Sequence, residues 1–361
     1  MKQKVKLKDI ASYSKGSQIN GTELIENGEF DYLNGGINPS GKWNEANCNA
    51  DTIAISEGGN SCGYVNYMRK PFWCGAHCYY LYDTVANTKY LYYALKSQQE
   101  RIMKLRSGAC MPNIKKSDLG NFEFIFDDDD KQQKNTTDIL NKIERVIELR
   151  QKEIFYLDEL VKARFVEMFG GCTNRIFIND ICSIITDGTH QSPKFHNTGI
   201  PFILVSNLSN NVITYNTEKF INEETYNELI KRTPIEIGDV LLSTVGSYGH
   251  PAIVTENKKF LFQRHIAYMK PKHDLVNSVY LHSALLSSDI QQQIEDKVKG
   301  IAQKTLNLSE IRKIVLPLPS IDEQNQFADF VQQVDKSKSA IKKSLEETQI
   351  LFDSLMQKYF S

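Results

Sequence analysis

The sequence predicts an α+β protein in which two α/β domains stand in tandem, each followed by a long helix, with the two helices forming an antiparallel coiled coil. Two observations lead to this prediction. The segment LDELVKARF at 157–165 is echoed by FDSLMQKYF at 352–360, at the end of the chain. Around both segments, apolar residues recur at seven-residue steps, which is typical of a coiled-coil helix.

The echo belongs to a longer internal repeat. Further matches are VKLKDIASY at 5–13 with IFINDICSI at 176–184, YLYYALKS at 90–97 with YLHSALLS at 280–287, and SGACMPNIKKSDL at 107–119 with KGIAQKTLNLSEI at 299–311. The order of the matches is the same in both copies, and the second copy carries about 17 extra residues early on. We therefore interpret the chain as a tandem duplication of one unit.

In the first copy, residues 1–126 predict an α/β domain, because β-type runs such as DTIAIS and FEFIF alternate with Gly, Asn and Ser turns. Residues 127–172 predict a helix of about 40 residues, or about 60 Å, because no proline or glycine intervenes between Asp127 and Gly170. Its predicted seam, flanked by Val146 and Leu160, contains Leu140, Ile147, Ile154, Leu157 and Val161.

In the second copy, residues 173–319 predict the matching domain, with strands in PFILVSN, DVLLSTV, HIAYM and IVLPLP. Residues 320–361 predict the second helix, whose seam contains Val334, Ile341, Leu345, Phe352 and Leu355. The simplest arrangement pairs the two helices antiparallel and holds the domains apart. The alternative is that each helix lies on its own domain as an ordinary long helix.

Composition narrows the possible classes of protein. Seven cysteines without a C-x-x-C pair argue against a disulfide framework and a structural zinc site. The cluster of Cys74, His77 and Cys78 in WCGAHCYY is more typical of a buried strand than of a metal site. No apolar run approaches the roughly 20 residues that span a bilayer, so we expect a cytoplasmic protein.

Charge is ambiguous about the ligand. The expected domains are weakly basic, with 15 Lys and Arg against 12 Asp and Glu in residues 1–126, and 15 against 14 in residues 173–319. The expected helices are acidic. A nucleic-acid ligand would therefore require clustered cations or a second subunit that helps to hold the phosphate backbone.

Catalytic motifs are absent from the sequence. No two prolines are adjacent, which excludes the D/N-P-P-Y/F element of amino-methyltransferases, and there is no G-x-x-x-x-G-K-S/T phosphate loop. We therefore expect no catalytic residue, metal or cofactor in this chain. His190 in DGTH has no metal-ligand spacing or nucleophile beside it, which leaves substrate contact and a loop-stabilising role open.

Four segments carry a resemblance to a known family: ISEGGNSCGYVNY at 55–67, IITDGTHQSPKF at 184–195, GDVLLSTVGSYGHPAIV at 238–254, and LNLSEIRKIVLPLPSIDEQNQFADFV at 306–331. Together with the repeated helices, they resemble the specificity subunits of type I restriction-modification systems over essentially the whole chain. One departure is FEFIFDDDDKQQK at 122–134, where the second copy has VLPLPSIDEQNQF. It leaves the start of the first helix open.

The resemblance implies that each α/β domain is a target recognition domain that reads one half of a split, asymmetric site on double-stranded DNA. The helices would form the spacer and the docking surface for two methyltransferase subunits, with restriction subunits in the full complex. Adenine N6 methylation with S-adenosylmethionine, and cleavage with ATP and Mg²⁺, would belong to those partners. The rival hypothesis is a non-enzymatic scaffold or adaptor that binds proteins through the same two domains.

The candidate DNA contacts come from glycine-rich loops, where the backbone can approach a ligand and polar side chains can match base edges. They are Asn34, Lys42, Asn60 and Tyr64 in the first domain, and His190, Gln191, Lys194, Ser247, Tyr248 and Arg264 in the second. For each of them the alternative is that it merely stabilises a turn.

Overall fold

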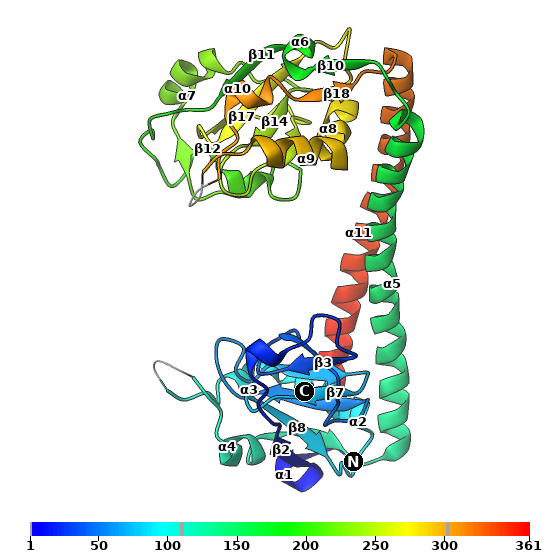
Figure 1. Cartoon of the computed structure of the whole chain (residues 1–361). Coiled ribbons are helices and arrows are strands. Elements are labelled where there is room, and N and C mark those ends of the chain that lie inside the picture. Colours follow the sequence, from blue (N-terminus) through cyan, green and yellow to red (C-terminus); the bar gives the residue numbers. More distant parts are fainter. Residues whose placement is uncertain (1, 109–111, 301–303) are drawn as a thin grey trace. The chain divides into compact units, whose positions relative to one another are not determined.

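The computed structural model describes residues 2–108, 112–300 and 304–361. Contacts divide the chain into two compact units, Met1–Gln151 with Lys343–Ser361, and Lys152–Lys342. Each unit contains one globular part together with half of each of two long helices, α5 (Asp130–Phe169) and α11 (Ile321–Phe360) (Figure 1). The α+β fold class and the two long helices of the prediction are thereby confirmed.

The first unit contains two sheets and a two-stranded ribbon. The four-stranded sheet has the order β2-β8-β5-β6 and is antiparallel, whereas the three-stranded sheet β4-β3-β7 pairs β3 with β7 in parallel. The ribbon pairs β1 with β9. The elements are β1 (Lys2–Lys6), α1 (Leu7–Ile10), β2 (Ser12–Lys15), β3 (Phe30–Leu33), β4 (Gly41–Trp43), β5 (Thr52–Ser56), β6 (Val65–Met68), β7 (Phe72–Cys74), β8 (Cys78–Tyr82), α2 (Thr88–Ser97), α3 (Gln99–Met103), α4 (Lys116–Gly120) and β9 (Glu123–Asp127).

The second unit repeats this topology strand for strand. Its sheets have the orders β11-β17-β14-β15 and β13-β12-β16, and its ribbon pairs β10 with β18. The elements are β10 (Arg175–Phe177), α6 (Ile178–Ile181), β11 (Cys182–Asp187), β12 (Ile200–Ile203), β13 (Phe220–Ile221), α7 (Glu223–Leu229), β14 (Val240–Ser243), β15 (Pro251–Ile253), β16 (Leu261–Phe262), β17 (Ile266–Pro271), α8 (Ser278–Leu286), α9 (Ser288–Lys297), α10 (Leu308–Ile311) and β18 (Val315–Pro317). The duplication is confirmed, and the added residues include α7.

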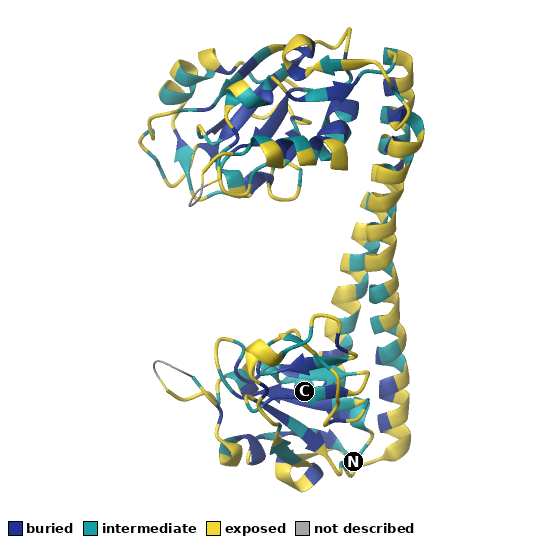
Figure 2. Cartoon of the chain, viewed as in Figure 1, coloured by how far each residue is buried: buried dark blue, intermediate teal, exposed yellow. Residues whose placement is uncertain are grey.

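The central strands are apolar throughout because both of their faces are covered. In β5, Ile53 and Ile55 pack in the same cluster as α2, while Ala54 faces the cluster of the three-stranded sheet. In β14, Val240 and Leu242 pack with α8, while Leu241 faces the other way. A strand buried on both faces has no polar position to alternate with, which explains the runs IAI and VLL and the dark strands of Figure 2.

The two long helices begin with different caps. Ser320 and Glu323 form a capping box before α11, with the Ser320 N–H donating to the Glu323 carboxylate at 2.9 Å. Before α5, the carboxylate of Asp129 instead accepts the N–H of Lys131 at 2.8 Å and that of Gln132 at 3.2 Å. Asp129, in the acidic run, therefore caps α5 in place of the serine that caps α11, and α5 begins at Asp130.

Within each unit the two helices run antiparallel. In the first unit Leu140 shares a core cluster with Met356 and Phe360, and the guanidinium of Arg150 donates to the carbonyl of Ser344 at 2.6 Å. The helix halves also pack on the globular core there, so antiparallel pairing and packing on a globular part occur together within the unit.

In the second unit the ring centroids of Phe165 and Phe327 lie 5.6 Å apart, and Lys338 pairs with Asp158. The ten predicted seam residues are buried or half-buried. Val146 and Leu160, predicted to flank the seam, expose 38% and 46% of their surface. Such exposure is compatible with a flanking position, which lies between the partner helix and solvent.

Candidate functional site

In the first unit, turns from four parts of the chain meet at one end of the four-stranded sheet. Backbone bonds hold them in place: Ser17 N–H donates to the Cys74 carbonyl at 2.9 Å, Glu57 N–H to the His77 carbonyl at 2.8 Å, and Ile114 N–H to the Glu57 carbonyl at 2.9 Å. Three of these turns follow or precede strands β2, β5 and β8, so the sheet fixes their positions. The sequences of these turns are short, glycine-rich and polar.

The second unit holds its turns with the same bonds. Thr189 N–H donates to the Phe262 carbonyl at 3.0 Å, Thr244 N–H to the His265 carbonyl at 2.9 Å, and Leu306 N–H to the Thr244 carbonyl at 2.8 Å. Each bond has its counterpart in the first unit, so the two units present one framework with different side chains. This correspondence equates Glu57 with Thr244 and His77 with His265.

A glycine after β2 and after β11 is required by close packing. A Cβ on Gly16 would lie 1.8 Å from the Cys74 carbonyl oxygen, and one on Gly188 would lie 2.2 Å from that of Phe262. The run SKGSQ at 14–18 is therefore the counterpart of TDGTH at 186–190, and sequence reasoning missed it. The repeat itself could have revealed this match. The two runs are 172 residues apart, whereas the matching segments just before them are 171 residues apart, and the register irregularity between Cys182 and Ile184 accounts for the one extra residue.

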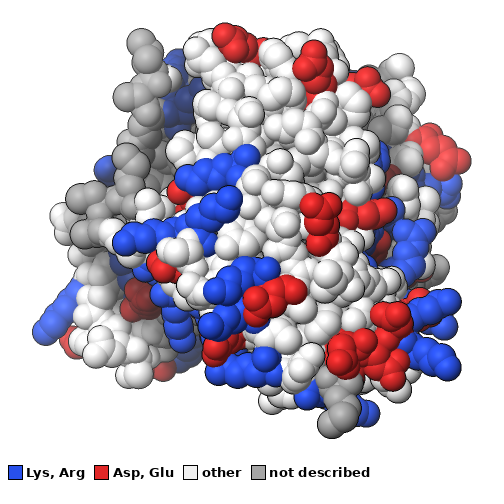
Figure 3. Space-filling view, turned by 90° about the horizontal axis from the view of Figure 1, so that it is seen from below, with Lys and Arg blue, Asp and Glu red and all other residues white. Residues whose placement is uncertain are grey.

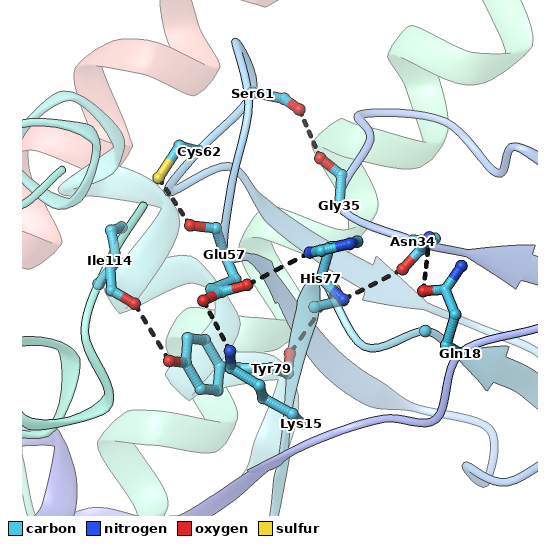
Figure 4. Close-up of polar contacts among 12 residues, drawn as sticks. Lys15, Gln18, Asn34, Gly35, Glu57, Ser61, Cys62, His77, Tyr79 and Ile114 are labelled. Carbon is cyan, nitrogen blue, oxygen red and sulfur yellow. Dashed lines mark hydrogen bonds and ion pairs between the residues drawn. The ribbon is translucent and has the colours of Figure 1, made fainter. Parts of the chain in front are cut away.

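A polar network links the turns of the first unit, with Glu57 at its centre (Figure 4). Its side chain is 11% exposed, and its carboxylate lies 2.7 Å from Lys15 Nζ and 3.6 Å from His77 Nδ1. Below it, burial raises the pKa of Tyr79 to about 12, and the Tyr79 hydroxyl donates to the Ile114 carbonyl at 3.1 Å. The carboxylate of Glu57 is thus held between two cationic or polar partners and is not free to meet a ligand alone.

The predicted contacts of the first unit fall into two groups. Asn34 is half-buried: its amide donates to Gln18 at 3.2 Å and accepts the His77 N–H at 3.1 Å, so it joins three turns. Tyr64 is half-buried under Lys96, whose Nζ lies 3.7 Å from the ring centroid. Lys42 and Asn60 are exposed, with no side-chain hydrogen bond to another residue in the described ranges. Lys42 lies on β4, and Asn60 in the turn after β5.

In the second unit, Asp187 takes the position of Lys15 and turns toward other partners. Its carboxylate lies 2.8 Å from His190 Nε2 and 2.5 Å from an Arg232 terminal nitrogen. Arg232 follows α7, in the part of the chain that the first unit lacks. This ion pair uses residues 45 positions apart, which no local pattern in the sequence reveals.

Beside Asp187 lies a hollow of about 550 Å³. Its wall contains Thr244, Arg264, His265 and residues 305–309. Arg264 is exposed, and within the described part of the chain no carboxylate lies at ion-pair distance from it. Its Nε donates to His265 Nε2 at 3.3 Å. Burial, followed by the charge of Arg264, lowers the pKa of His265, which favours the neutral ring that this bond requires.

The other predicted contacts of the second unit also divide. Tyr248 is half-buried, and its hydroxyl bonds to Glu295 and Lys304. Gln191, Lys194 and Ser247 are exposed, and none has a side-chain hydrogen bond to a described residue. His190 is exposed but already paired with Asp187. Of the predicted contacts, Arg264 lies next to the TDGTH turn, because its N–H donates to the Thr189 carbonyl at 3.1 Å.

The seam residues of the long helices are partly covered, whereas other apolar side chains on α5 face solvent. In the second unit, Phe155, Tyr156, Leu160 and Val166 expose between 46% and 64% of their surface. Apolar surface of this kind, on a helix whose other face is already packed, is typical of a protein-binding surface.

Surface charge, metal-ligand groups and membrane spans can be described for the residues that the structure covers. On the face shown in Figure 3, Lys and Arg are interspersed with Asp and Glu. Among the residues that the structure describes, no group of three or more His, Cys, Asp or Glu is arranged to hold a metal ion. Cys74 and Cys78 are fully buried in the core, as the strand interpretation expects. None of the described helices is long and apolar enough to cross a membrane.

Comparison with known proteins gives a consistent result. The family model of the type I restriction modification DNA specificity domain matches residues 2–157 and 174–350. A Mycoplasma genitalium protein described as a type I specificity subunit is 25% identical over 96% of this chain and 90% of its own length. The Escherichia coli EcoBI specificity subunit is 28% identical over 45% of this chain and 35% of that subunit.

Solved structures show the same fold. The crystal structure of a type I restriction-modification S subunit from M. genitalium superposes with a TM-score of 0.63 at 22% identity, covering 100% of this chain and 96% of that one. A chain from a study of complex assembly in the type I system superposes with a TM-score of 0.56 at 14% identity, covering 99% and 97%.

Proposed function

Because the chain belongs to the type I restriction modification DNA specificity domain family, we propose that it is the DNA-recognition subunit of such a system and reads a bipartite, asymmetric site. The observation that carries this proposal is the repeated framework of turns, which holds different side chains in the two units. Equal frameworks bring two reading surfaces to DNA in the same manner. Unequal side chains, such as Glu57 against Thr244, make the two half-sites differ in sequence.

Methylation and cleavage are assigned to partner subunits. The sequence contains neither the D/N-P-P-Y/F element nor a phosphate loop, and S-adenosylmethionine, ATP and Mg²⁺ would bind to the methyltransferase and restriction subunits. The long helices offer apolar side chains to these partners, among them Phe155 and Tyr156. Weakly basic domains fit this division of work, because partner subunits would contribute contacts to the phosphate backbone.

The test is reconstitution. The purified chain alone should methylate no DNA, and addition of methyltransferase subunits from the same source should produce methylation at one split motif. Binding of the complex to DNA with that motif should exceed binding to random duplex at the same salt concentration, and both should weaken as salt rises. Methyl transfer by the chain alone would contradict the proposal by showing that the chain is itself catalytic, whereas equal affinity for both duplexes would favour a protein scaffold.

A further inference from the structure

We propose that Arg264 reads a guanine in the half-site recognised by the second unit, and that the first unit cannot read a base in this way. This inference rests on the proposed function and names one side chain and one base for it. It comes from comparing positions that the shared backbone bonds make equivalent.

The equivalence is fixed on both sides of Arg264. Phe262 corresponds to Cys74, because their carbonyls accept the N–H groups of Thr189 and Ser17. Likewise His265 corresponds to His77, because the carbonyl of His265 accepts the N–H of Thr244 and the carbonyl of His77 accepts the N–H of Glu57. The chain has the same number of residues between these points in both units, so Arg264 occupies the position of Ala76.

The charges around this position differ between the units. In the first unit the carboxylate of Glu57 is closed off by Lys15 and His77, as Figure 4 shows, and alanine offers no donor at position 76. The second unit has the uncharged Thr244 in place of Glu57, and its own carboxylate, Asp187, is occupied by His190 and Arg232. Arg264 is thereby left without an acid at ion-pair distance in the described part of the chain.

The guanidinium is also oriented. Its Nε donates to His265 Nε2, so His265 acts as a positioning residue that leaves the two terminal nitrogens free of this bond, and both residues line the hollow. These nitrogens form a planar fork of donors, and guanine presents two acceptors, O6 and N7, at matching separation in the major groove. Adenine, cytosine and thymine do not present that pair of acceptors.

A base edge suits this position better than a phosphate does. Asp187 lines the same hollow as Arg264 and is ion-paired with Arg232, so the charges at this hollow have both signs. A guanine edge carries no net charge and does not require an excess of positive charge there, as a phosphate would. The predicted ligand is therefore a G·C pair approached through the major groove.

The experiment uses the chain reconstituted with its methyltransferase subunits and a plasmid library in which the split motif is randomised. Exchange of residues 173–319 with a related chain first assigns one half-site to the second unit. In that half-site, Arg264→Ala should relax one position that is guanine in the wild-type motif, with discrimination falling about 5- to 150-fold. The other half-site should not change. Arg264→Lys keeps the charge but loses the fork, and should relax the same position.

Arg175→Ala is the matched control, because Arg175 is an exposed arginine of the same unit on β10, paired with Asp289. It should leave the motif intact. His265→Ala should relax the base position that Arg264 reads, but should cause no further relaxation when Arg264 is already replaced by alanine. This difference separates a positioning role of His265 from a general effect on folding.

Three results would overturn the inference. One is an unchanged motif with the folded Arg264→Ala variant. Another is relaxation in the half-site of the first unit. The third is uniformly weaker binding with a reduced salt slope, which would identify Arg264 as a phosphate contact. Failure of the wild-type complex to methylate any motif would instead reject the proposed function as a whole.

Discussion

Gln133 and Gln324 occupy the same position in the two units and make the same bond. The side-chain oxygen of Gln133 accepts the N–H of Asn87 at 3.1 Å, and that of Gln324 accepts the N–H of Asn277 at 2.9 Å. Each asparagine caps the following helix, α2 or α8. Both glutamines are at most 2% exposed. Each long helix is therefore anchored to its globular part by one buried amide.

We expect Gln133→Met and Gln324→Met to destabilise their own units. Methionine keeps the volume but leaves the partly buried N–H of Asn87 or Asn277 without this acceptor, which costs about 1–3 kcal/mol. Urea denaturation followed by circular dichroism should show an earlier transition in each variant. Gln132→Met and Gln326→Met are the controls, because both side chains are exposed. Equal stability of buried and exposed variants would contradict the anchoring role.

The glycine of the SKGSQ and TDGTH turns provides a second stability prediction. Gly16→Ala and Gly188→Ala place a methyl group within 1.8 Å and 2.2 Å of a backbone carbonyl oxygen, so the turn must move and about 1–3 kcal/mol of stability should be lost. Gly21→Ala and Gly171→Ala have nothing within 4 Å of the added methyl group and should be nearly neutral. Thermal melts of the four variants test this, and a neutral Gly188→Ala would show that the turn is not fixed.

Much of the fold could be predicted from the sequence because its signals are local. The runs TIAIS and VLLS are strands β5 and β14, and the seven-residue periodicity correctly predicts α5 and α11. The collinear repeat also predicts that both units share one topology. These features depend on residues within a few positions of one another, or on direct repetition.

The candidate site was less predictable because its partners meet only after folding. Lys15 and Glu57 are 42 residues apart and form an ion pair that no spacing rule reveals. Arg232 reaches Asp187 from the inserted segment after β13. The role of Asn34 as a link between turns, in place of a free contact, likewise follows from neighbours that the sequence does not bring together.

Two asparagines of the first unit separate support from contact. Asn34→Ala breaks bonds to Gln18 and to the His77 N–H, so it should lower the melting temperature of the first unit and weaken recognition of its whole half-site. Asn60 is exposed, so Asn60→Ala should keep the melting temperature and relax at most one base position. Melting curves combined with methylation mapping distinguish these outcomes. An intact melting temperature in Asn34→Ala would show that its bonds do not hold the turns.

The shared framework predicts that the units are modular. Replacing residues 173–319 by the matching segment of a related chain should change one half of the methylated motif and preserve the other, because each unit has its own core and its own set of turns. Sequencing of methylated plasmids from cells that carry the hybrid complex tests this. Change in both halves would mean that the units read one continuous surface.

The exposed apolar side chains of α5 predict where a partner subunit binds. Phe155 and Tyr156 expose 59% and 64% of their surface, although they follow seam position Ile154, which is half-buried. Aromatic residues often dominate binding energy at protein interfaces, and losing one such anchor costs about 2 kcal/mol or more. Phe155→Ala and Tyr156→Ala should therefore weaken binding of a methyltransferase subunit by about 30-fold or more, while the melting temperature stays constant.

Phe177→Ala is the control, because Phe177 is 50% exposed but lies on β10 of the globular part. Surface plasmon resonance with the immobilised chain would measure the change. If both aromatic variants bound the partner as tightly as Phe177→Ala does, the docking surface would have to lie elsewhere, and the exposed rings of α5 would need another explanation.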